Sequence, residues 1–475
     1  MIYNISKSQV LQRIKFENYW WSHGHVEEDY KCMQRRLYFN VFKNYVFETD
    51  VNRALVLMGP RRVGKTVMLH HSVQELIDKG VNPQKIIFIT VENPVYNNIS
   101  LEELFQYAVE ALGHHEYKNF YVFFDEIQYL KDWEVHLKTL VDTYKHTKFI
   151  VSGSAAAALK FKSNESGAGR FTDFLLPPLT FYEYIHINKL GHLLKESQIE
   201  WHDKKLPFFE SIDQQLLNEH FVKYINFGGY PEIIFSETMQ QNPGRFIKQD
   251  IVDKVMLRDL PSLYGIKDVQ ELNSLFTSIC FNTANEFDYE QLSKNSGVKK
   301  HLIKTYIEYL ASAFLIKKIN KVDQSGKVFK RESKFKLYLS NPSLYAALFA
   351  PVQITDDDKM GNMVETAIFS QWMHRDTFRP YYARWNNGEV DMVGIDQARL
   401  KPNWALEIKW SNRFVKKPKS LKSLMSFCQQ NNLKSALVTT ISEKTIQNIE
   451  GIDIQFVPSA TYAYNVGKKT LDNKN

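Results

Sequence analysis

The sequence predicts an α/β fold in which a parallel β-sheet is covered on both faces by helices. The alternation of two kinds of segment supports this prediction. Short apolar segments alternate with helix-length segments between residues 54 and 151, and strands that alternate with helices in this way form parallel sheets. The chain has 475 residues, which at ~100 to 200 residues per domain allows about three domains. We therefore expect further domains after this sheet.

The elements of the first part are expected to alternate without interruption. The first strand enters a loop bounded by glycines, and a helix begins near Thr66. The expected order is strand 54–58, helix 66–79, strand 85–91, helix 101–112, strand 121–124, helix 133–144 and strand 148–151. Beyond Phe181 the pattern becomes mainly helical, so the α/β core is expected to end near residue 180.

The middle of the chain predicts three helices followed by a β-hairpin. Helical spacing runs from Leu272 to Ile319, with the third helix at about 299–314, and Gly326 marks the turn of the hairpin. This order is typical of a winged helix-turn-helix, whose third helix commonly enters the major groove of DNA. The residues that would face nucleic acid are Lys299, Lys300, His301 and Lys304. Two alternatives stay open, because these residues are also typical of a solvated helix face and because winged helices also dock proteins.

The last part of the chain predicts a separate α/β domain. Its expected order is helix 361–374, strand 378–385, strand 389–395, strand 404–410, helix 418–430, strand 435–440, helix 443–449 and strand 452–457. The pair Asn387-Gly388 between two extended segments is a strong hairpin signal. We therefore expect a mixed sheet in this domain.

Composition excludes several classes of protein. No apolar run approaches the ~18 to 20 residues that cross a bilayer, and the first twenty residues mix charges with apolar side chains, unlike a secretory signal. We expect a cytoplasmic protein that does not span a membrane. The three cysteines, Cys32, Cys280 and Cys428, are far apart and odd in number, which favours reduced residues over disulfides or a zinc site.

The net charge of +7 is concentrated in one segment. Between Lys317 and Lys336 the sequence has eight basic residues against Asp323 and Glu332, a local excess of six. Such clustering predicts either contacts with the phosphates of nucleic acid or a solvated basic loop. Charge alone does not separate the two.

The loop after the first strand matches the phosphate-binding P-loop pattern at every position. Its glycines, Gly59 and Gly64, let backbone N–H groups turn toward phosphate oxygens, and the following helix N-terminus adds a favourable dipole. Lys65 would reach the β- and γ-phosphates, and Thr66 would ligate Mg²⁺. The expected nucleotide-binding residues are Gly59, Pro60, Arg61, Arg62, Val63, Gly64, Lys65, Thr66 and Val67, together with Ser154.

Two acids follow an apolar strand about sixty residues later. Asp125 is expected to hold Mg²⁺ through its water shell, and Glu126 is expected to act as the base that orients the attacking water. Ser152 and Ser154 end the next strand, where either hydroxyl could sense the γ-phosphate. The alternative for these serines is ordinary loop chemistry.

The last domain contains a set of carboxylates and a lysine with a recognisable spacing. Glu407 and Lys409 lie two apart on one expected strand and share a face, while Asp391 lies on the preceding strand and Glu365 on the helix before it. In a nuclease site Asp391 and Glu407 would hold Mg²⁺ or Mn²⁺ with support from Glu365, and Lys409 would activate water. Glu389 is expected on the opposite face, in solvent. A domain kept for binding without cleavage is the open alternative.

The chain resembles a family of prokaryotic AAA+ ATPases that join an ATPase core to a winged helix and a restriction-endonuclease-like domain of the PD-(D/E)xK type. The segments that carry the resemblance are 59–66, 125–130 with Trp133 and Glu134, 152–154, 169–170, 176–179, 228–232, 336–339 and 407–409. The resemblance implies that Arg170 is an arginine finger acting across a subunit interface of a homo-oligomer. A salt-bridged loop arginine is the alternative.

Together these features predict four parts: 1–180, a lead-in and P-loop ATPase core; 181–260, a helical lid; 261–350, a winged helix; and 355–467, a restriction-endonuclease-like domain. The first functional hypothesis is an ATP-controlled enzyme that grips DNA and cuts it. The second is an ATP-dependent switch that binds DNA or a partner protein and whose last domain is inert. ATP and Mg²⁺ are the expected cofactors. A scaffold without turnover conflicts with the complete set of P-loop residues.

Overall fold

The computed structural model describes residues 5–154, 169–201, 204–266, 268–329, 333–374 and 379–472. The chain forms two compact units, unit 1 up to Pro177 and unit 2 from Pro178. Within the described residues, no helix combines the length and the apolar character needed to cross a membrane.

Unit 1 is built on a parallel five-stranded sheet, which confirms the expected fold class. The strands are β1 (Ala54–Met58), β2 (Ile86–Thr90), β3 (Tyr121–Asp125), β4 (Lys148–Gly153) and β5 (Phe171–Leu175), in the spatial order β2-β3-β4-β1-β5. The four predicted strands are almost wholly buried, as expected for a sheet covered on both faces. The edge strand β5 was not predicted, because Thr172 and Asp173 interrupt its apolar pattern.

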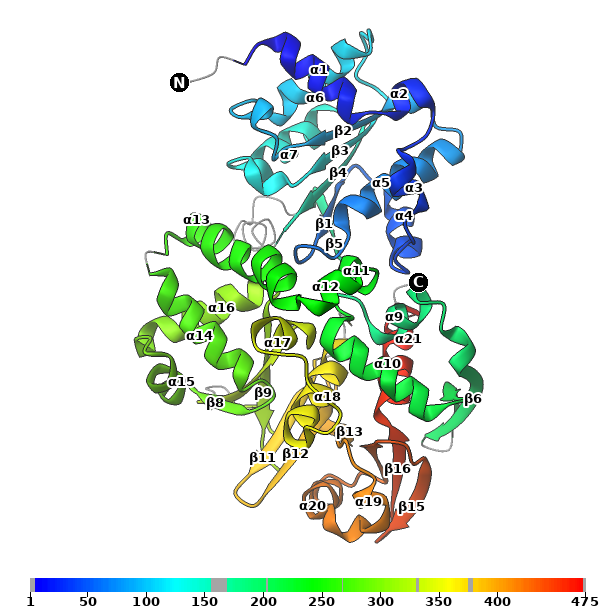
Figure 1. The fold of residues 1–475 in the computed structure, drawn as a ribbon, viewed down its shortest axis with the longest axis vertical. Coiled ribbons are helices and arrows are strands. Elements are labelled where there is room, and N and C mark those ends of the chain that lie inside the picture. The colour runs from blue at the N-terminus through cyan, green and yellow to red at the C-terminus, as the bar shows by residue number, and fades with distance from the viewer. Residues whose placement is uncertain are drawn as a thin grey trace. The chain divides into compact units, whose positions relative to one another are not determined.

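Helices cover both faces of this sheet. The predicted helices are α5 (Lys65–Asp78), α6 (Leu101–Ala111) and α7 (Trp133–Thr143). Four further helices precede the sheet: α1 (Lys7–Glu17), α2 (Trp20–His23), α3 (Glu28–Cys32) and α4 (Phe39–Phe47). Figure 1 shows α6 and α7 on one side of the strands and α5 with α3 and α4 on the other. The start of α6 is fixed by a capping box between Ser100 and Glu103.

The N-terminal lead-in binds the exposed edge of β2. The side-chain amide of Asn18 donates to the carbonyl of Phe88 at 2.8 Å and accepts from its N–H at 2.7 Å, as a neighbouring strand would. The indoles of Trp20 and Trp21 both donate to the carbonyl of Ile86. An uncovered edge strand presents unpaired backbone groups to other chains, so this lead-in completes the sheet.

Unit 2 contains a nine-stranded sheet in the order β15-β16-β14-β13-β12-β11-β9-β10-β8. Its strands are β8 (Glu286–Asp288), β9 (Ile316–Val322), β10 (Lys334–Leu339), β11 (Tyr381–Trp385), β12 (Gly388–Asp396), β13 (Lys401–Glu407), β14 (Ser435–Thr440), β15 (Thr445–Ile449) and β16 (Ile452–Pro458). Strand β11 pairs in parallel with β9. The strands that the sequence assigns to two different parts of the chain therefore share one sheet.

The helices of unit 2 lie before, between and after these strands. They include α9 (Phe181–Ile187), α10 (Gln214–Phe227), α11 (Pro231–Ile234), α12 (Glu237–Gln241), the helical segments η6 (Gly244–Asp253) and η7 (Val255–Asp259), α13 (Leu260–Tyr264), α14 (Val269–Phe281), α15 (Tyr289–Ser296), α16 (Lys300–Ser312), α17 (Ser343–Leu348), α18 (Asp357–Trp372), α20 (Lys422–Gln430) and α21 (Ser459–Asp472). Figure 1 shows α14, α15 and α16 gathered beside β8 and β9. The sequence predicted three helices and a hairpin in this region.

Three local predictions in unit 2 were wrong. The expected helix 443–449 is the edge strand β15, which is paired on one side only by β16 and whose side chains alternate in exposure. The hairpin of β6 (Leu194–Trp201) and β7 (Lys204–Ser211) lies in a segment predicted to be helical, because charged residues obscure its alternation. The third strand of the last part ends at Glu407, three residues earlier than expected.

A buried histidine behind the P-loop makes unit 1 sensitive to acid. His70 on α5 is 5% exposed, stacks on Tyr30 with ring centres 3.8 Å apart, and has no hydrogen-bond partner for Nδ1 among the described residues. Burial, with a smaller effect of His71, lowers the pKa of His70 from 6.5 to about 3. The folded state therefore keeps this ring neutral while the unfolded chain takes up a proton below pH 6.5.

We predict that this difference weakens folding as the pH falls from 6.5 toward 3. At pH 5 the loss is about 2 kcal/mol for this group. Replacing His70→Phe should remove that loss, so the free energy of urea unfolding of the variant should fall less between pH 7 and pH 5 than that of the native chain. The exposed His115→Phe serves as the control and should behave like the native protein. An equal pH dependence in the two variants would contradict the assignment.

Candidate functional sites

The P-loop lies between β1 and α5, as its sequence pattern predicts. Gly64 has φ 93° at the start of α5, a left-handed conformation that favours glycine. Gly59 passes close to the end of β5, because a Cβ there would lie 2.2 Å from the carbonyl oxygen of Leu176. Lys65 is 5% exposed and donates to the carbonyls of Gly59 and Pro60. Its ammonium group is thus held within the loop.

The N-terminal lead-in also supports the loop. Arg36 is buried and donates to the carbonyl of Val63 at 2.7 Å and to that of Pro177 at 3.0 Å. Arg61 of the loop donates to the hydroxyl of Tyr129. Sequence reasoning missed Arg36, because its role depends on contacts with residues far along the chain.

Asp125 reaches the P-loop from the end of β3. It accepts a hydrogen bond from the hydroxyl of Thr66 at 2.7 Å and another from Ser152 at the end of β4. Burial, together with the neighbouring Glu126, raises the pKa of Asp125 to about 6. Its hydrogen bonds come from neutral hydroxyls, and the nearby ammonium of Lys65 offsets the effect of burial on its pKa only in part. This is the arrangement expected of a carboxylate that acts on Mg²⁺ beside a threonine ligand.

Glu126 is tied to the strand end that carries Ser154. Its φ of 55° is unusual for a residue other than glycine, and such conformations gather at functional sites. The side-chain amide of Gln128 donates to the Glu126 carboxylate. The amide oxygen of Gln128 accepts the N–H of Ser154 at 3.1 Å. The buried hydroxyl of Ser154 has no hydrogen-bond partner among the described residues. A phosphate oxygen would satisfy it.

These residues fit ATP and Mg²⁺. The open N-terminus of α5 has no side-chain cap, Thr66 and Asp125 are already in contact, and the Ser154 hydroxyl lacks a partner. Val67 follows Thr66 on the first turn of α5. Arg170 is half-exposed and pairs through Nε with Asp142 at 2.9 Å, which agrees with the salt-bridge alternative stated for it.

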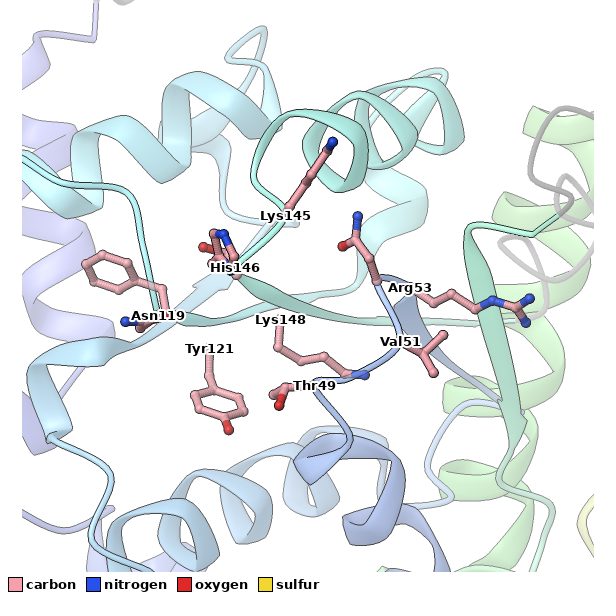
Figure 2. A pocket seen from close by; sticks show the side chains of 11 residues that line it. Thr49, Val51, Arg53, Asn119, Tyr121, Lys145, His146 and Lys148 are labelled. Atoms are coloured by element: carbon pink, nitrogen blue, oxygen red, sulfur yellow. The ribbon is translucent and has the colours of Figure 1, made fainter.

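A polar pocket lies at the end of the same sheet opposite the P-loop, where the strands begin (Figure 2). It has a volume of about 300 Å³ and is lined by residues that precede β1, β3 and β4. Burial lowers the pKa of Lys148, whose ammonium donates to the carbonyl of Glu48. Figure 2 shows Lys145 pointing away from Lys148 and Arg53. Because these cations do not converge, the pocket is not arranged like an anion site.

In unit 2 the predicted carboxylates and lysine do come together. Lys409 lies 3.1 Å from Asp391 and 2.8 Å from Glu407. Asp391, which is 6% exposed, also accepts the N–H of Ile408 at 2.8 Å. Glu407 is less well satisfied, since its Oε2 is buried without a hydrogen-bond partner in the described part of the chain.

The structure adds a second lysine to this group. Lys336 on β10 is 3% exposed and lies 2.9 Å from Glu365, 2.7 Å from Glu389 and 4.0 Å from Asp391. The hydroxyl of Tyr338, also on β10, donates to Glu365 at 2.6 Å. We call Glu365, Glu389, Asp391, Glu407, Lys336 and Lys409 the carboxylate cluster.

Two sequence-based expectations about these residues were wrong. Glu389 was predicted on the opposite face from Asp391, yet residues two apart on a strand share a face. Both carboxylates lie near the ammonium of Lys336. Lys336 was counted among the basic residues that could contact phosphates, but it is buried and paired with carboxylates.

The charges in the cluster shift its pKa values in opposite directions. Burial alone would lower the pKa of Lys336, but Glu365, Asp391 and Glu389 outweigh it and raise that pKa. Burial would raise the pKa of Asp391, yet Lys409 and Lys336 hold it below its ordinary value. Burial and the neighbouring Asp391 raise the pKa of Glu407 to about 7. The two lysines are therefore the counter-ions of the cluster.

The predicted Mg²⁺ or Mn²⁺ ligands do not fit a divalent cation in this arrangement. Within the residues that the structure describes, no group of three or more His, Cys, Asp or Glu side chains is placed to hold a metal. The physical reason is visible in the cluster, where Lys409 lies between Asp391 and Glu407 and Lys336 lies between Glu365 and Glu389. Ammonium groups stand where the carboxylates would have to converge.

Most of the predicted basic surface is exposed. On α16, Lys300, His301 and Lys304 face solvent, while Ile303 and Ile307 are buried. Lys317, Lys327 and Lys334 are also exposed on or between the neighbouring strands. Lys330 and Arg331 lie outside the described residues.

Two segments match known sequence families. Residues 51–185 match a family described as an AAA domain. Residues 218–357 match a domain of unknown function, DUF8612.

The chain is also similar to three uncharacterized proteins. One from Methanocaldococcus jannaschii is 25% identical over 350 residues, which cover 72% of this chain and 72% of that protein. A second from the same organism is 22% identical over 351 residues, with 71% and 72% covered. One from Haemophilus influenzae is 22% identical over 302 residues, with 62% and 70% covered.

Similar solved structures include the ORC1 protein of Aeropyrum pernix in complex with DNA, at 10% identity and a TM-score of 0.32, with 66% of this chain and 92% of that chain covered. The replication initiator DnaA bound to AMPPCP and single-stranded DNA has 13% identity and a TM-score of 0.28, with 58% and 88% covered. The Hsp104–ADP complex of S. cerevisiae has 13% identity and a TM-score of 0.29, with 58% and 37% covered.

The strand order, the loop between β1 and α5 and the family match support one another. The sheet is parallel with β1 between β4 and β5, and the matched segment 51–185 contains the sheet and the loop. Unit 1 is an α/β unit with a parallel sheet and a P-loop, and its segment 51–185 is similar to an AAA domain.

Proposed function

We propose that the chain binds ATP with Mg²⁺ at the P-loop, hydrolyses it, and uses the cycle to control attachment of unit 2 to DNA. The observation that carries this proposal is the contact of Thr66 with Asp125 beside the linked pair Glu126 and Gln128. A magnesium ligand, a metal-directed carboxylate and an acid that can activate water are thereby brought to one end of the sheet.

Each residue has a defined task in this proposal. Lys65 would neutralise the β- and γ-phosphates, while Thr66 and Asp125 would hold Mg²⁺. Glu126 would accept a proton from the attacking water, and Ser154 would sense the γ-phosphate through its unpartnered hydroxyl. The metal would supply positive charge that offsets the charge developing on the phosphate. Arg170 as an arginine finger in a homo-oligomer stays a prediction, as does a cytoplasmic location.

The order α14, β8, α15, α16, β9, β10 supports a winged helix in unit 2. Its third helix, α16, presents Lys300, His301 and Lys304 to solvent. These side chains would contact phosphates, which position a protein on DNA without reading its sequence. We propose DNA as the ligand of this face.

The last part of the chain is proposed to be a restriction-endonuclease-like domain that does not cleave DNA. The sheet order of β11 to β14 and the meeting of Asp391, Glu407 and Lys409 support that fold. The position of Lys336 favours an inert domain. A metal-dependent nuclease is the second candidate, favoured by the Lys409 contacts. Cleavage of supercoiled, linear or branched DNA with Mg²⁺ or Mn²⁺ that disappears in Lys409→Ala would establish it.

Removing the P-loop ammonium should weaken nucleotide binding. We expect Lys65→Ala to raise the Kd for ATP by about tenfold or more, since hydrogen bonds to charged groups contribute about 1.5–3 kcal/mol. Isothermal titration calorimetry with a non-hydrolysable analogue measures this directly. The exposed Lys79→Ala, just after the same helix, is the control. Unchanged affinity in Lys65→Ala would remove the P-loop from the proposal.

Neutralising the proposed base should separate binding from turnover. We expect Glu126→Gln to keep its affinity for ATP and to slow phosphate release by about 10²- to 10⁴-fold, the usual contribution of a positioned acid or base. The exposed Glu116→Gln should turn over ATP like the native chain. Equal turnover in Glu126→Gln would show that another group activates the water.

DNA binding through α16 should depend steeply on salt, because bound phosphates release counter-ions. Replacing Lys300 and Lys304 by alanine should reduce the slope of log K against log salt by about 0.9 for each lost phosphate contact. Fluorescence anisotropy over a salt series measures the slope, and the exposed pair Lys422 and Lys434 provides a matched control. A slope that is flat in the native protein would exclude this face.

A further inference from the structure

Lys336 reaches the carboxylate cluster from a distant part of the sequence. It lies on β10, which pairs with β8 and β9, whereas Glu365 comes from α18 and Glu389 and Asp391 come from β12. Its ammonium is within 4.0 Å of all three carboxylates and 5.5 Å from the ring centre of Tyr382. One buried cation therefore joins three separate elements of unit 2.

The cluster would be costly without this cation. Glu365 is 12% and Asp391 9% exposed by side chain, and a carboxylate that is buried without a partner is strongly unfavourable. Arg384 pairs with Glu389 from the solvent side, but among the described residues no other ammonium or guanidinium forms an ion pair with Glu365. A metal ion could serve the same purpose, but the ammonium of Lys336 already occupies the point that these three carboxylates share.

We infer that Lys336 is the resident cation of the carboxylate cluster in place of a divalent metal, and that it forms an ionic latch with Glu365, Glu389 and Asp391. The latch fastens β10 to α18 and β12. A divalent cation gains a place among these carboxylates only when the ammonium is removed. This inference concerns the ion pairs of unit 2 alone and does not depend on ATP hydrolysis.

The latch also explains why Tyr338 accompanies Lys336. Both side chains leave the same face of β10, two residues apart, and both bind Oε1 of Glu365. The hydroxyl satisfies the carboxylate by hydrogen bonding and the ammonium satisfies it by charge. Lys334, on the same face of the same strand, is 52% exposed by side chain and pairs with Glu286 instead, which makes it a matched control.

The test uses the full-length, nucleotide-free chain and Mn²⁺ as the metal probe. Binding of Mn²⁺ is measured by electron paramagnetic resonance of the free ion in the native chain, Asp391→Asn and Lys336→Met. Hydrogen–deuterium exchange of β10 is measured in the same proteins and in Lys334→Met. We expect no Asp391-dependent site in the native chain. The Lys336→Met variant should gain a Mn²⁺ site. Its β10 amides should exchange at least about tenfold faster than in the native chain, whereas those of Lys334→Met should not.

Mn²⁺ should slow the exchange of β10 in Lys336→Met, since the metal replaces the missing charge. The inference would be overturned if the native chain bound Mn²⁺ and the Asp391→Asn variant lost that binding. It would also be overturned if the β10 amides exchanged at the same rate in Lys336→Met and in Lys334→Met. Should Lys336→Met fail to fold, the double variant with Glu365→Gln removes the unpaired charge and is expected to fold. If the double variant were no more stable than Lys336→Met alone, the latch would also be overturned. The Mn²⁺ measurement on the native chain tests the inference independently of these variants.

Discussion

A carboxylate on a buried strand must find a partner, and the nature of that partner distinguishes the two sites of this protein. Asp125 is met by the hydroxyls of Thr66 and Ser152. Hydroxyls satisfy its oxygens without cancelling its charge, which leaves that charge for a metal ion. Asp391 is met by the ammonium groups of Lys409 and Lys336, which compensate its charge from within the chain. Two buried aspartates thus suit different chemistry because their partners differ.

Sequence reasoning succeeded where local structure depends on consecutive residues. The P-loop, the pair Asp125 and Glu126, and the buried strands β1 to β4 could all be predicted, because an apolar strand followed by a short polar turn is a local signal. The spacing of Asp391, Glu407 and Lys409 also predicted that they would meet. The nucleotide and metal roles of these residues stay predictions.

Contacts that form only in three dimensions could not be predicted in the same way. Lys336 precedes Glu365 by 29 residues and appeared to be one more basic residue of an exposed segment. Glu389 could have been placed correctly, because strand periodicity alone puts it beside Asp391. Asn18 and Arg36 act through the backbone of distant segments, on β2 and on the P-loop, and backbone partners leave no trace in side-chain patterns. The edge strand β5 was missed because Thr172 and Asp173 interrupt its apolar pattern, and β15 was missed because its side chains alternate in exposure.

The pairing of β9 with β11 has a consequence for how this chain can be divided. Tyr381, Tyr382 and Ala383 of β11 lie in register with Asn320, Lys321 and Val322 of β9, so backbone hydrogen bonds run through the boundary expected near residue 355. A fragment that ends near residue 355 lacks β11 and exposes one edge of β9. A fragment that begins there lacks β9 and exposes one edge of β11. Each would expose an unpaired strand edge with a tendency to pair with other chains. The two parts are therefore expected to be soluble only together, and a gene that carried either one alone would encode an aggregation-prone product.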